Sequence, residues 1–154
     1  MWWNFFKREP KPFSEGYLPE NDGHLIYYRQ FGNPSGLPVL SFHGGPGGSS
    51  RPKYAKLFDK NKYRFIQFDQ RGCGNSTAEN FLKNNNTEAT LNDALRLLEH
   101  LNISQPIIVQ GASWGSTLAL LFAEAYPQKI SKIIVSSVFL ARPYDLSWVN
   151  SESE

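Results

Sequence analysis

The sequence predicts an α/β protein whose mixed, mostly parallel sheet is flanked by helices. Short apolar segments alternate with helical patterns through the second half of the chain, which is the order of parallel strands joined by crossover helices. The apolar segments at 106–109 and 130–138 are largely unbroken, as expected for strands covered on both faces. Nearer the start, an Asp-Gly pair at residues 22–23 separates two extended segments and predicts an antiparallel hairpin at one edge.

The first half of the chain predicts an arm followed by strands. Residues 1–15 are rich in proline, lysine and aromatic side chains, and they predict an extended N-terminal arm. After the hairpin, residues 38–42 predict a short apolar strand that leads directly into a glycine cluster. Residues 63–68 predict another strand, which ends at Asp69. We expect the hairpin to add antiparallel strands to the edge of the parallel sheet.

The second half predicts helices alternating with strands. A helix is expected after Thr90, a candidate cap, because five apolar residues follow at helical spacing: Leu91, Ala94, Leu95, Leu98 and Leu101. Residues 106–109 predict a buried strand, and 116–126 predict a helix that ends before Pro127. The last strand is expected at 130–138. These elements define a core at 16–148, followed by a polar tail at 149–154.

The composition excludes several classes of protein. The 154 residues are 40% hydrophobic and 19% charged with a net charge of +2, which excludes a highly charged disordered chain and gives no basic stripe for nucleic acid. One cysteine and three histidines predict neither a disulfide framework nor a metal site. No apolar run approaches the roughly 18–20 residues of a membrane helix, and no signal peptide is recognisable. We therefore expect a cytoplasmic protein with no nucleic-acid or membrane partner.

The motif with the clearest chemistry is a G-x-S-x-G at residues 111–115, between an apolar strand and a helix. This is the setting of a nucleophile elbow, where a sharp strand-to-helix turn leaves the serine hydroxyl exposed. Small residues are needed on both sides because the strand and the helix pass close together there. The alternative is a glycine-serine loop without function, but the flanking strand and helix favour Ser113 as a nucleophile.

A second glycine-rich segment, at residues 43–48, follows the strand expected at 38–42. Acyl transfer requires N–H donors aimed at the developing oxyanion. One donor comes from the residue after the nucleophile, here Trp114, and another from a glycine-rich loop, for which Gly44 is the candidate. The segment lacks the G-K-[ST] ending of a phosphate-binding loop. We expect His43 to be a structural hydrogen-bonding residue rather than the general base.

A third loop, at residues 69–76, follows the strand expected at 63–68. Its glycines permit a tight turn beside the candidate site. Asp69 and Arg71 carry opposite charges, and we expect them to pair and brace this loop. Cys73 is expected to fill space rather than act as a nucleophile, because no flanking histidine offers it a proton acceptor.

In this order and spacing, the three motifs resemble those of the proline iminopeptidases, which are serine peptidases of the α/β-hydrolase fold that remove N-terminal proline from peptides. The resemblance runs from about residue 16 to residue 148. It implies Ser113 as the nucleophile and the amides of Gly44 and Trp114 as oxyanion donors. It also implies that Phe139 packs on the proline ring of the peptide substrate. No cofactor is implied, because acyl transfer through serine needs none.

The resemblance covers only the N-terminal half of that family. Its triad order places an acidic residue and then a histidine after the serine, but this sequence has no histidine after Ser113, and the family's cap domain is absent too. We therefore expect a truncated, inactive form. Ala112 and Asn75 also depart from the family, where glycine and arginine are common at these positions.

Two other interpretations stay open. In the first, the chain is not catalytic by itself: it is a remnant, or a half-protein that needs a separate C-terminal partner chain. In the second, it is an esterase or amidase of the same fold. The hydrophobic strand expected at 130–138 would present an unpaired edge, and such edges aggregate or recruit partners. Self-association, or pairing with the missing C-terminal half, is the resulting expectation.

Overall fold

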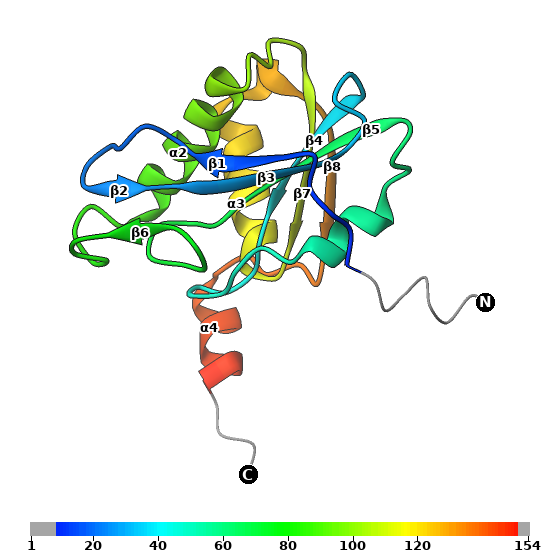
Figure 1. Ribbon diagram of the computed structural model, residues 1–154. Coiled ribbons are helices and arrows are strands. Elements are labelled where there is room, and N and C mark those ends of the chain that lie inside the picture. The colour runs from blue at the N-terminus through cyan, green and yellow to red at the C-terminus, as the bar shows by residue number, and fades with distance from the viewer. Residues whose placement is uncertain (1–8, 151–154) are drawn as a thin grey trace.

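Residues 9–150 form a six-stranded mixed sheet with two helices across one face (Figure 1). A computed structural model describes these residues and the side chains of residues 9–147. The strands lie in the order β1-β3-β5-β4-β7-β8. Their bounds are β1 Ser14–Tyr17, β3 Tyr27–Gly32, β4 Leu37–Phe42, β5 Tyr63–Phe68, β7 Ile107–Ala112 and β8 Ile130–Ser136. The predicted α/β class with a mixed sheet is confirmed.

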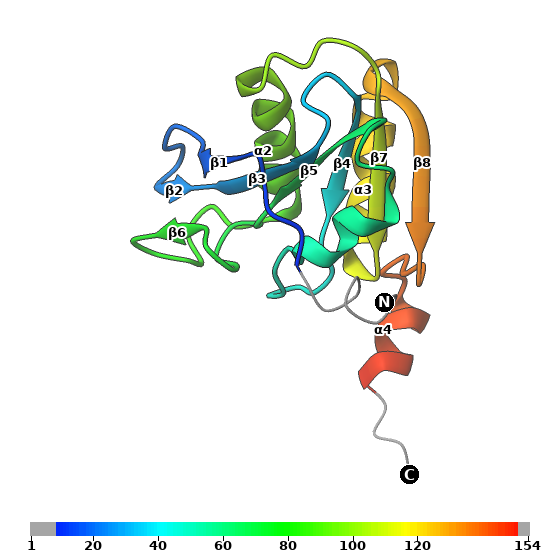
Figure 2. The ribbon, with the colours of Figure 1, turned by 45° about the vertical axis from the view of Figure 1, so that its right-hand side comes forward.

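The sheet is antiparallel at one edge and parallel elsewhere. β1 pairs with β3 and β3 with β5 in antiparallel register, whereas the β5–β4, β4–β7 and β7–β8 pairs are all parallel. The predicted hairpin turn lies between β1 and β2 (His24–Leu25), and β2 pairs with β6 (Thr77–Ala78) in a small second sheet. Figure 2 shows β4 and β8 running in one direction, toward the edge where α4 (Pro143–Asn150) lies.

The larger core lies between the sheet and two helices, α2 (Thr87–His100) and α3 (Trp114–Ala125). Inward-facing strand residues pack against the apolar faces of both helices, and burying such side chains contributes about 1.5–3 kcal/mol each. The residues at the centre of this core are Ile26, Leu40, Phe42, Ile66, Phe68, Ala94, Leu97, Leu98, Val109, Leu118, Ala119 and Phe122. This core fixes the parallel strands whose ends carry the candidate site.

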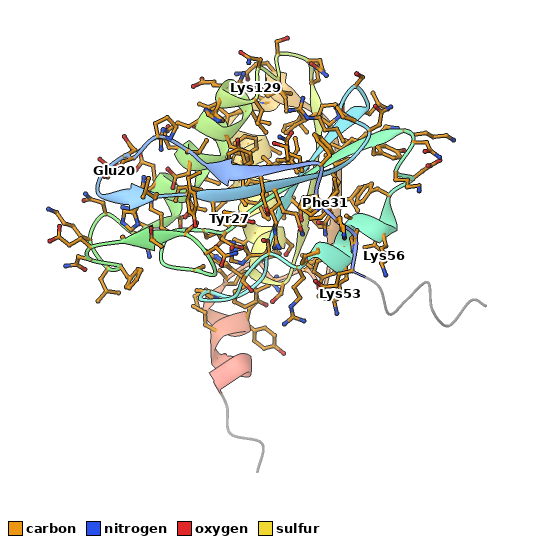
Figure 3. All side chains as sticks on the ribbon, viewed as in Figure 1. Glu20, Tyr27, Phe31, Lys53, Lys56 and Lys129 are labelled. Carbon is orange, nitrogen blue, oxygen red and sulfur yellow. The ribbon has the colours of Figure 1, made fainter. Side chains whose placement is uncertain are left out.

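A smaller core lies on the other face of the sheet, beneath the 3₁₀ helix η1 (Pro52–Leu57). It contains Phe31, Val39, Ala55, Phe65 and Ile108. Figure 3 shows Phe31 near η1, which carries Lys53 and Lys56. Between these elements lies a groove of about 1060 Å³, so this face is less completely covered than the face under α2 and α3.

The cap of α2 differs from the expectation. The helix begins at Thr87, and the side chain of Asn86 accepts a hydrogen bond from the Ala89 amide at 2.8 Å. Thr90 lies inside the first turn, where its hydroxyl bonds back to the Asn86 carbonyl at 3.2 Å. Asparagine is among the strongest N-cap residues, and residues 87–89, Thr-Glu-Ala, add no large apolar side chain that would mark the first turn as helical.

Other boundaries also differ from the expectation. β7 extends to Ala112 because its ladder with β8 continues to the pair Ala112–Ser136, and β8 ends there rather than at residue 138. α3 begins immediately after Ser113, and α4 was not expected.

The two ends of the chain also differ from the expectation. Part of the predicted arm is β1, while residues 1–8 lie outside the described residues. Part of the predicted tail belongs to α4, and residues 151–154 also lie outside. Among the described residues, no helix combines the length and apolar character needed to cross a membrane.

Candidate active site

Three loops meet at the carboxyl edge of the parallel strands. The loop after β4 carries the glycine cluster, the loop after β5 begins at Asp69, and the turn after β7 carries Ser113. The glycine cluster and Ser113 line one pocket of about 430 Å³. Parallel sheets present their ligand sites at this edge. The fold thus brings the glycine cluster next to Ser113, although the two are about 70 residues apart in the chain.

Ser113 has the backbone of a nucleophile elbow. Its φ of 55° and ψ of −129° lie in a region that side-chain-bearing residues rarely adopt, and its side chain is exposed. The turn is possible because its flanking glycines leave room. A Cβ on Gly111 would lie 2.0 Å from the Gly115 carbonyl oxygen, and a Cβ on Gly115 would lie 2.2 Å from the Phe42 carbonyl oxygen. The Ser113 amide also bonds to the Ser136 carbonyl at 3.2 Å, which ties the elbow to the end of β8.

The two candidate oxyanion donors flank Ser113. A Cβ on Gly44 would lie 3.3 Å from the Ser113 Cβ and 3.9 Å from its Oγ, so the Gly44 backbone passes directly beside the nucleophile. Trp114 is the first residue of α3, and the first N–H groups of a helix have no acceptor within it. The helix N-terminus adds a positive potential at the same place. This arrangement is suited to hold a negatively charged oxygen next to the Ser113 hydroxyl.

His43 has hydrogen-bonding partners on both ring nitrogens. Its Nε2 accepts a hydrogen bond from the Gln70 amide at 3.0 Å, so its Nδ1 carries the proton and donates to the Gly44 carbonyl at 2.8 Å. Burial lowers the pKa of His43 below its ordinary value, although the bond to Gly44 opposes that shift. The Gln70 side chain also donates to the His43 carbonyl at 2.8 Å. His43 therefore joins the first two loops and has no nitrogen left to accept a proton from Ser113.

Asp69 joins the same two loops at a second point. Its side chain is buried, and its carboxylate accepts hydrogen bonds from the Ser50 amide at 2.7 Å and the Asn75 amide at 2.8 Å. The Ser76 hydroxyl donates to the Asp69 carbonyl at 2.6 Å. A Cβ on Gly74 would lie 2.3 Å from this carboxylate, so only glycine leaves the loop space to close around Asp69. Asp69 thus holds the end of the glycine-rich loop.

Arg71 does not pair with Asp69 as expected. Its guanidinium makes a two-point ion pair with Asp93 of α2, at 2.7 and 3.0 Å, and reaches Asp22 at 3.3 Å. It also donates to the Asn84 carbonyl at 2.6 Å. The hydrogen bond to Asp93 raises the pKa of Arg71. Arg71 therefore braces the loop against α2 and the hairpin turn, because its side chain points into the protein while Asp69 turns toward the glycine-rich loop.

Phe139 lies three residues beyond β8, and its side chain is half-buried. Its amide donates to the Ser116 hydroxyl at 3.0 Å, and its carbonyl accepts a hydrogen bond from the Thr117 hydroxyl. The Ser116 hydroxyl in turn donates to the Ser113 carbonyl at 2.6 Å. The backbone of Phe139 is thus connected to the elbow through one serine side chain.

Several residues that build the site were not expected. Gln70, Ser116, Thr117 and Asp93 have no charge pattern or spacing that marks these roles, since each bonds to a partner that only the fold brings near. The described residues hold no group of three or more His, Cys, Asp or Glu side chains arranged to bind a metal. Burial raises the pKa of the Cys73 thiol, which keeps this thiol protonated near neutral pH.

Comparison with known proteins identifies the family. A family model described as the alpha/beta hydrolase fold matches residues 38–151, a stretch that contains all three loops. The chain belongs to the α/β hydrolase fold family. It is 41% identical over 138 residues to a proline iminopeptidase of Arabidopsis thaliana, covering 90% of this chain and 36% of that protein. It is 40% identical over 144 residues to a proline iminopeptidase of Xylella fastidiosa, covering 94% of this chain and 46% of that protein.

A solved structure of this α/β hydrolase family has the same fold. The proline iminopeptidase-related protein from Thermus thermophilus superposes with a TM-score of 0.68 at 26% identity, covering 79% of this chain and 43% of that one. The resemblance inferred from the three motifs is confirmed by these relatives. The chain spans less than half the length of each of these proteins.

Proposed function

We propose that this chain provides the nucleophile and the oxyanion hole of a serine aminopeptidase that releases N-terminal proline from peptides. The observation that carries the proposal is the exposed Ser113 on its strained turn, with the Gly44 backbone beside it. The proline iminopeptidases among its relatives support the choice of substrate. An esterase of the same fold would use the same elbow, so the substrate distinguishes the two.

In this proposal the reaction is acyl transfer. The Ser113 oxygen attacks the carbonyl carbon of the N-terminal proline, and the amides of Gly44 and Trp114 stabilise the oxyanion that forms. Collapse of the tetrahedral intermediate breaks the peptide bond, and the rest of the peptide leaves as an amine that takes up the proton lost by Ser113. A prolyl ester remains on Ser113, and water then hydrolyses it to release proline and restore the hydroxyl. Phe139 packs on the proline ring and favours this residue over others.

The proton acceptor is the part of this mechanism that the three histidines do not supply. His43 uses both ring nitrogens, and neither His24, which bonds to the Lys83 carbonyl at 2.7 Å, nor His100, at the end of α2, lines the pocket that contains Ser113. We propose that a histidine from beyond these residues accepts the Ser113 proton, on the same polypeptide or on a partner chain. Without it a serine hydroxyl is a poor nucleophile near neutral pH, so the 154-residue chain alone is expected to be inactive.

The first test is the mass and the activity of the protein from its source cell. We expect a product larger than 17.5 kDa, or a complex with a second chain, that releases p-nitroaniline from prolyl-p-nitroanilide. Ser113→Ala is expected to lower kcat by a factor of at least about 10⁴. Ser35→Ala, in the exposed turn before β4, is the matched control and is expected to leave the rate unchanged.

The remaining outcomes separate the alternatives. Cleavage of p-nitrophenyl esters without release from prolyl-p-nitroanilide would identify an esterase instead. A native product of 17.5 kDa that binds no second chain and cleaves neither substrate would identify a non-catalytic remnant. Full prolyl activity in Ser113→Ala would contradict the assignment of the nucleophile.

A further inference from the structure

We propose that the hydroxyls of Ser116 and Thr117 are positioning residues that fix Phe139 beside the elbow and thereby set the preference for proline. This inference rests on the proposed function, because it concerns the substrate specificity of that same site. It assigns a role to two buried side chains in the first turn of α3 that neither attack the substrate nor donate to the oxyanion.

The two hydroxyls hold both polar groups of the Phe139 backbone. Ser116 Oγ accepts the Phe139 amide at 3.0 Å, and Thr117 Oγ1 donates to the Phe139 carbonyl. Ser116 is fully buried and Thr117 is 8% exposed. Both bonds are partly buried, and breaking either of them leaves a Phe139 backbone group without this partner, which costs stability.

Ser116 also connects this segment to the nucleophile. Its hydroxyl donates to the Ser113 carbonyl at 2.6 Å while it accepts from the Phe139 amide. One oxygen therefore touches the elbow on one side and the Phe139 segment on the other. The Ser113 amide adds a third connection through its bond to the Ser136 carbonyl at 3.2 Å. The Phe139 backbone is thus linked by hydrogen bonds to the backbone of the elbow that carries Ser113.

The segment has few other supports among the described residues, apart from a hydrogen bond between the Leu140 backbone and the Asp145 carboxylate. Phe139 lies beyond the last ladder pair of the sheet, which is Ala112–Ser136. Ser137 and Ala141, on either side of it, have φ values of 47° and 54°, in the left-handed region that side-chain-bearing residues disfavour. The side chains between them are also poorly buried, since Val138 is 57% exposed and Leu140 is 46% exposed. A segment with these features would move without the two hydroxyls.

Fixing Phe139 matters for specificity because an aromatic ring packs on a pyrrolidine ring only at close range. Dispersion contacts weaken steeply when the gap widens by even 0.5–1 Å. A displaced ring therefore loses contact with a prolyl substrate, whereas an alanyl substrate, with a single methyl group, has little contact to lose. Release of the segment is expected to reduce the prolyl preference more than the rate of acyl transfer.

A purely structural role for the hydroxyls makes a different prediction. If Ser116 and Thr117 only satisfied the first turn of α3, their removal would lower stability and would affect all substrates equally. The ratio of prolyl to alanyl turnover and the exchange of the Phe139 amide therefore separate positioning from a merely structural contribution.

The first measurement is hydrogen exchange of the Phe139 amide by NMR, in the protein at its native length. In Ser116→Ala the amide loses its acceptor, and we expect its exchange to become about tenfold faster. The matched control is Ser131→Ala, which removes a hydroxyl that donates to the Ile107 carbonyl at 2.8 Å elsewhere in β8. We expect this control to leave exchange at Phe139 unchanged. Unchanged exchange in Ser116→Ala would overturn the proposal.

The second measurement compares KM for prolyl- and alanyl-p-nitroanilide. In Thr117→Val the valine has nearly the shape of threonine but lacks the hydroxyl donor. We expect this substitution to raise KM for the prolyl substrate about tenfold, the equivalent of one lost hydrogen bond. The kcat for this substrate and the KM for the alanyl substrate are expected to stay within about twofold. Thr117→Ser keeps the hydroxyl and is expected to restore the prolyl KM. Thr90→Val, which removes a similar buried helix hydroxyl bond in α2, is the control.

The same two substrates show whether the proposed function fails or only the role given to Ser116 and Thr117 fails. If the unaltered protein cleaves neither anilide, the proposed function fails and this inference fails with it. If the unaltered protein prefers prolyl substrate and Thr117→Val keeps that preference, only the present inference is overturned. An equal loss on both substrates, without rescue by Thr117→Ser, would show that the hydroxyl is merely structural.

Discussion

At the scale of single residues, His43 shows how hydrogen bonds determine a protonation state. The Gln70 amide can only donate, so it requires a lone pair on His43 Nε2, and the Gly44 carbonyl can only accept, so it requires a proton on Nδ1. Both requirements are met by one neutral tautomer. A second proton on Nε2 would oppose the Gln70 amide and would place a charge in a buried position.

This arrangement predicts the pH dependence of the His43 ring. Because its pKa in the folded protein is lowered below about 6.5, the unfolded chain binds more protons in the interval between the two values. The free energy of unfolding is therefore expected to fall as the pH drops below 6.5 through the folded pKa, and to be independent of His43 above 6.5. ¹⁵N NMR of the imidazole at pH 6.5 is expected to show that less than half of the rings are charged, and that the neutral form is protonated on Nδ1. A half-protonated ring at this pH would contradict the prediction.

At the scale of secondary-structure elements, Arg71 connects segments that are far apart in the chain. Its guanidinium contacts Asp93 of α2, Asp22 of the hairpin turn and the carbonyl of Asn84 in the loop before α2. The Arg71 side chain is fully buried, and that of Asp93 is 1% exposed. A buried charge pair of this kind contributes mainly through what its disruption would cost, because removing one partner leaves the other charge without compensation.

Arg71→Met is therefore expected to lower the free energy of unfolding by about 3–5 kcal/mol. The methionine fills much of the space, but among the described residues it leaves the Asp93 carboxylate with Arg96, at 3.2 Å, as its one remaining charged partner. Urea unfolding followed by circular dichroism measures the change. Arg142→Met is the matched control, because Arg142 forms a pair of similar length, 2.9 Å, with Asp145 on the surface, and surface pairs contribute little. Equal effects of the two substitutions would disprove the role given to burial.

The sequence predicts the centres of the elements better than their ends or their side-chain partners. The residues of β5 and the interior of α2 were predictable because apolar periodicity records which face is buried. The end of β7 depends on pairing with β8, and the start of α2 depends on Asn86, so neither follows from periodicity. The pairing of Arg71 shows the same limit, because Asp69 is near in sequence whereas Asp93 is near only after α2 has packed on the sheet.

At the scale of the whole molecule, the two edges of the sheet differ. β1, at one edge, has four residues, whereas β8, at the other edge, has seven. Among the described strands β8 pairs only with β7, and its Ile133 and Ile134 side chains are each 44% exposed. An apolar strand with free backbone N–H and C=O groups on one side is a template for pairing with another chain. In the 154-residue chain, a second copy can occupy this edge.

We therefore expect the 154-residue chain to associate through β8. Ile134→Lys places a charge on this edge strand and is expected to shift the chain toward the monomer, as charged side chains do on natural sheet edges. Sedimentation velocity over a range of concentrations measures the shift. Leu57→Lys, at an equally apolar position of η1 that is 71% exposed, is the control and is expected to leave association unchanged. A monomeric chain with cooperative unfolding at a high midpoint would contradict this prediction.

The contacts of Arg71 also restrict how the protein can evolve. Asp22, Asp93 and Arg71 lie on three different segments, and a substitution at one removes a charged partner from at least one of the others. A lineage that changes one of these positions passes through a destabilised ancestor unless a second change follows quickly. These positions are therefore expected to covary among homologues, and the loop that carries Arg71 is expected to be inherited together with the helix and the hairpin that hold it.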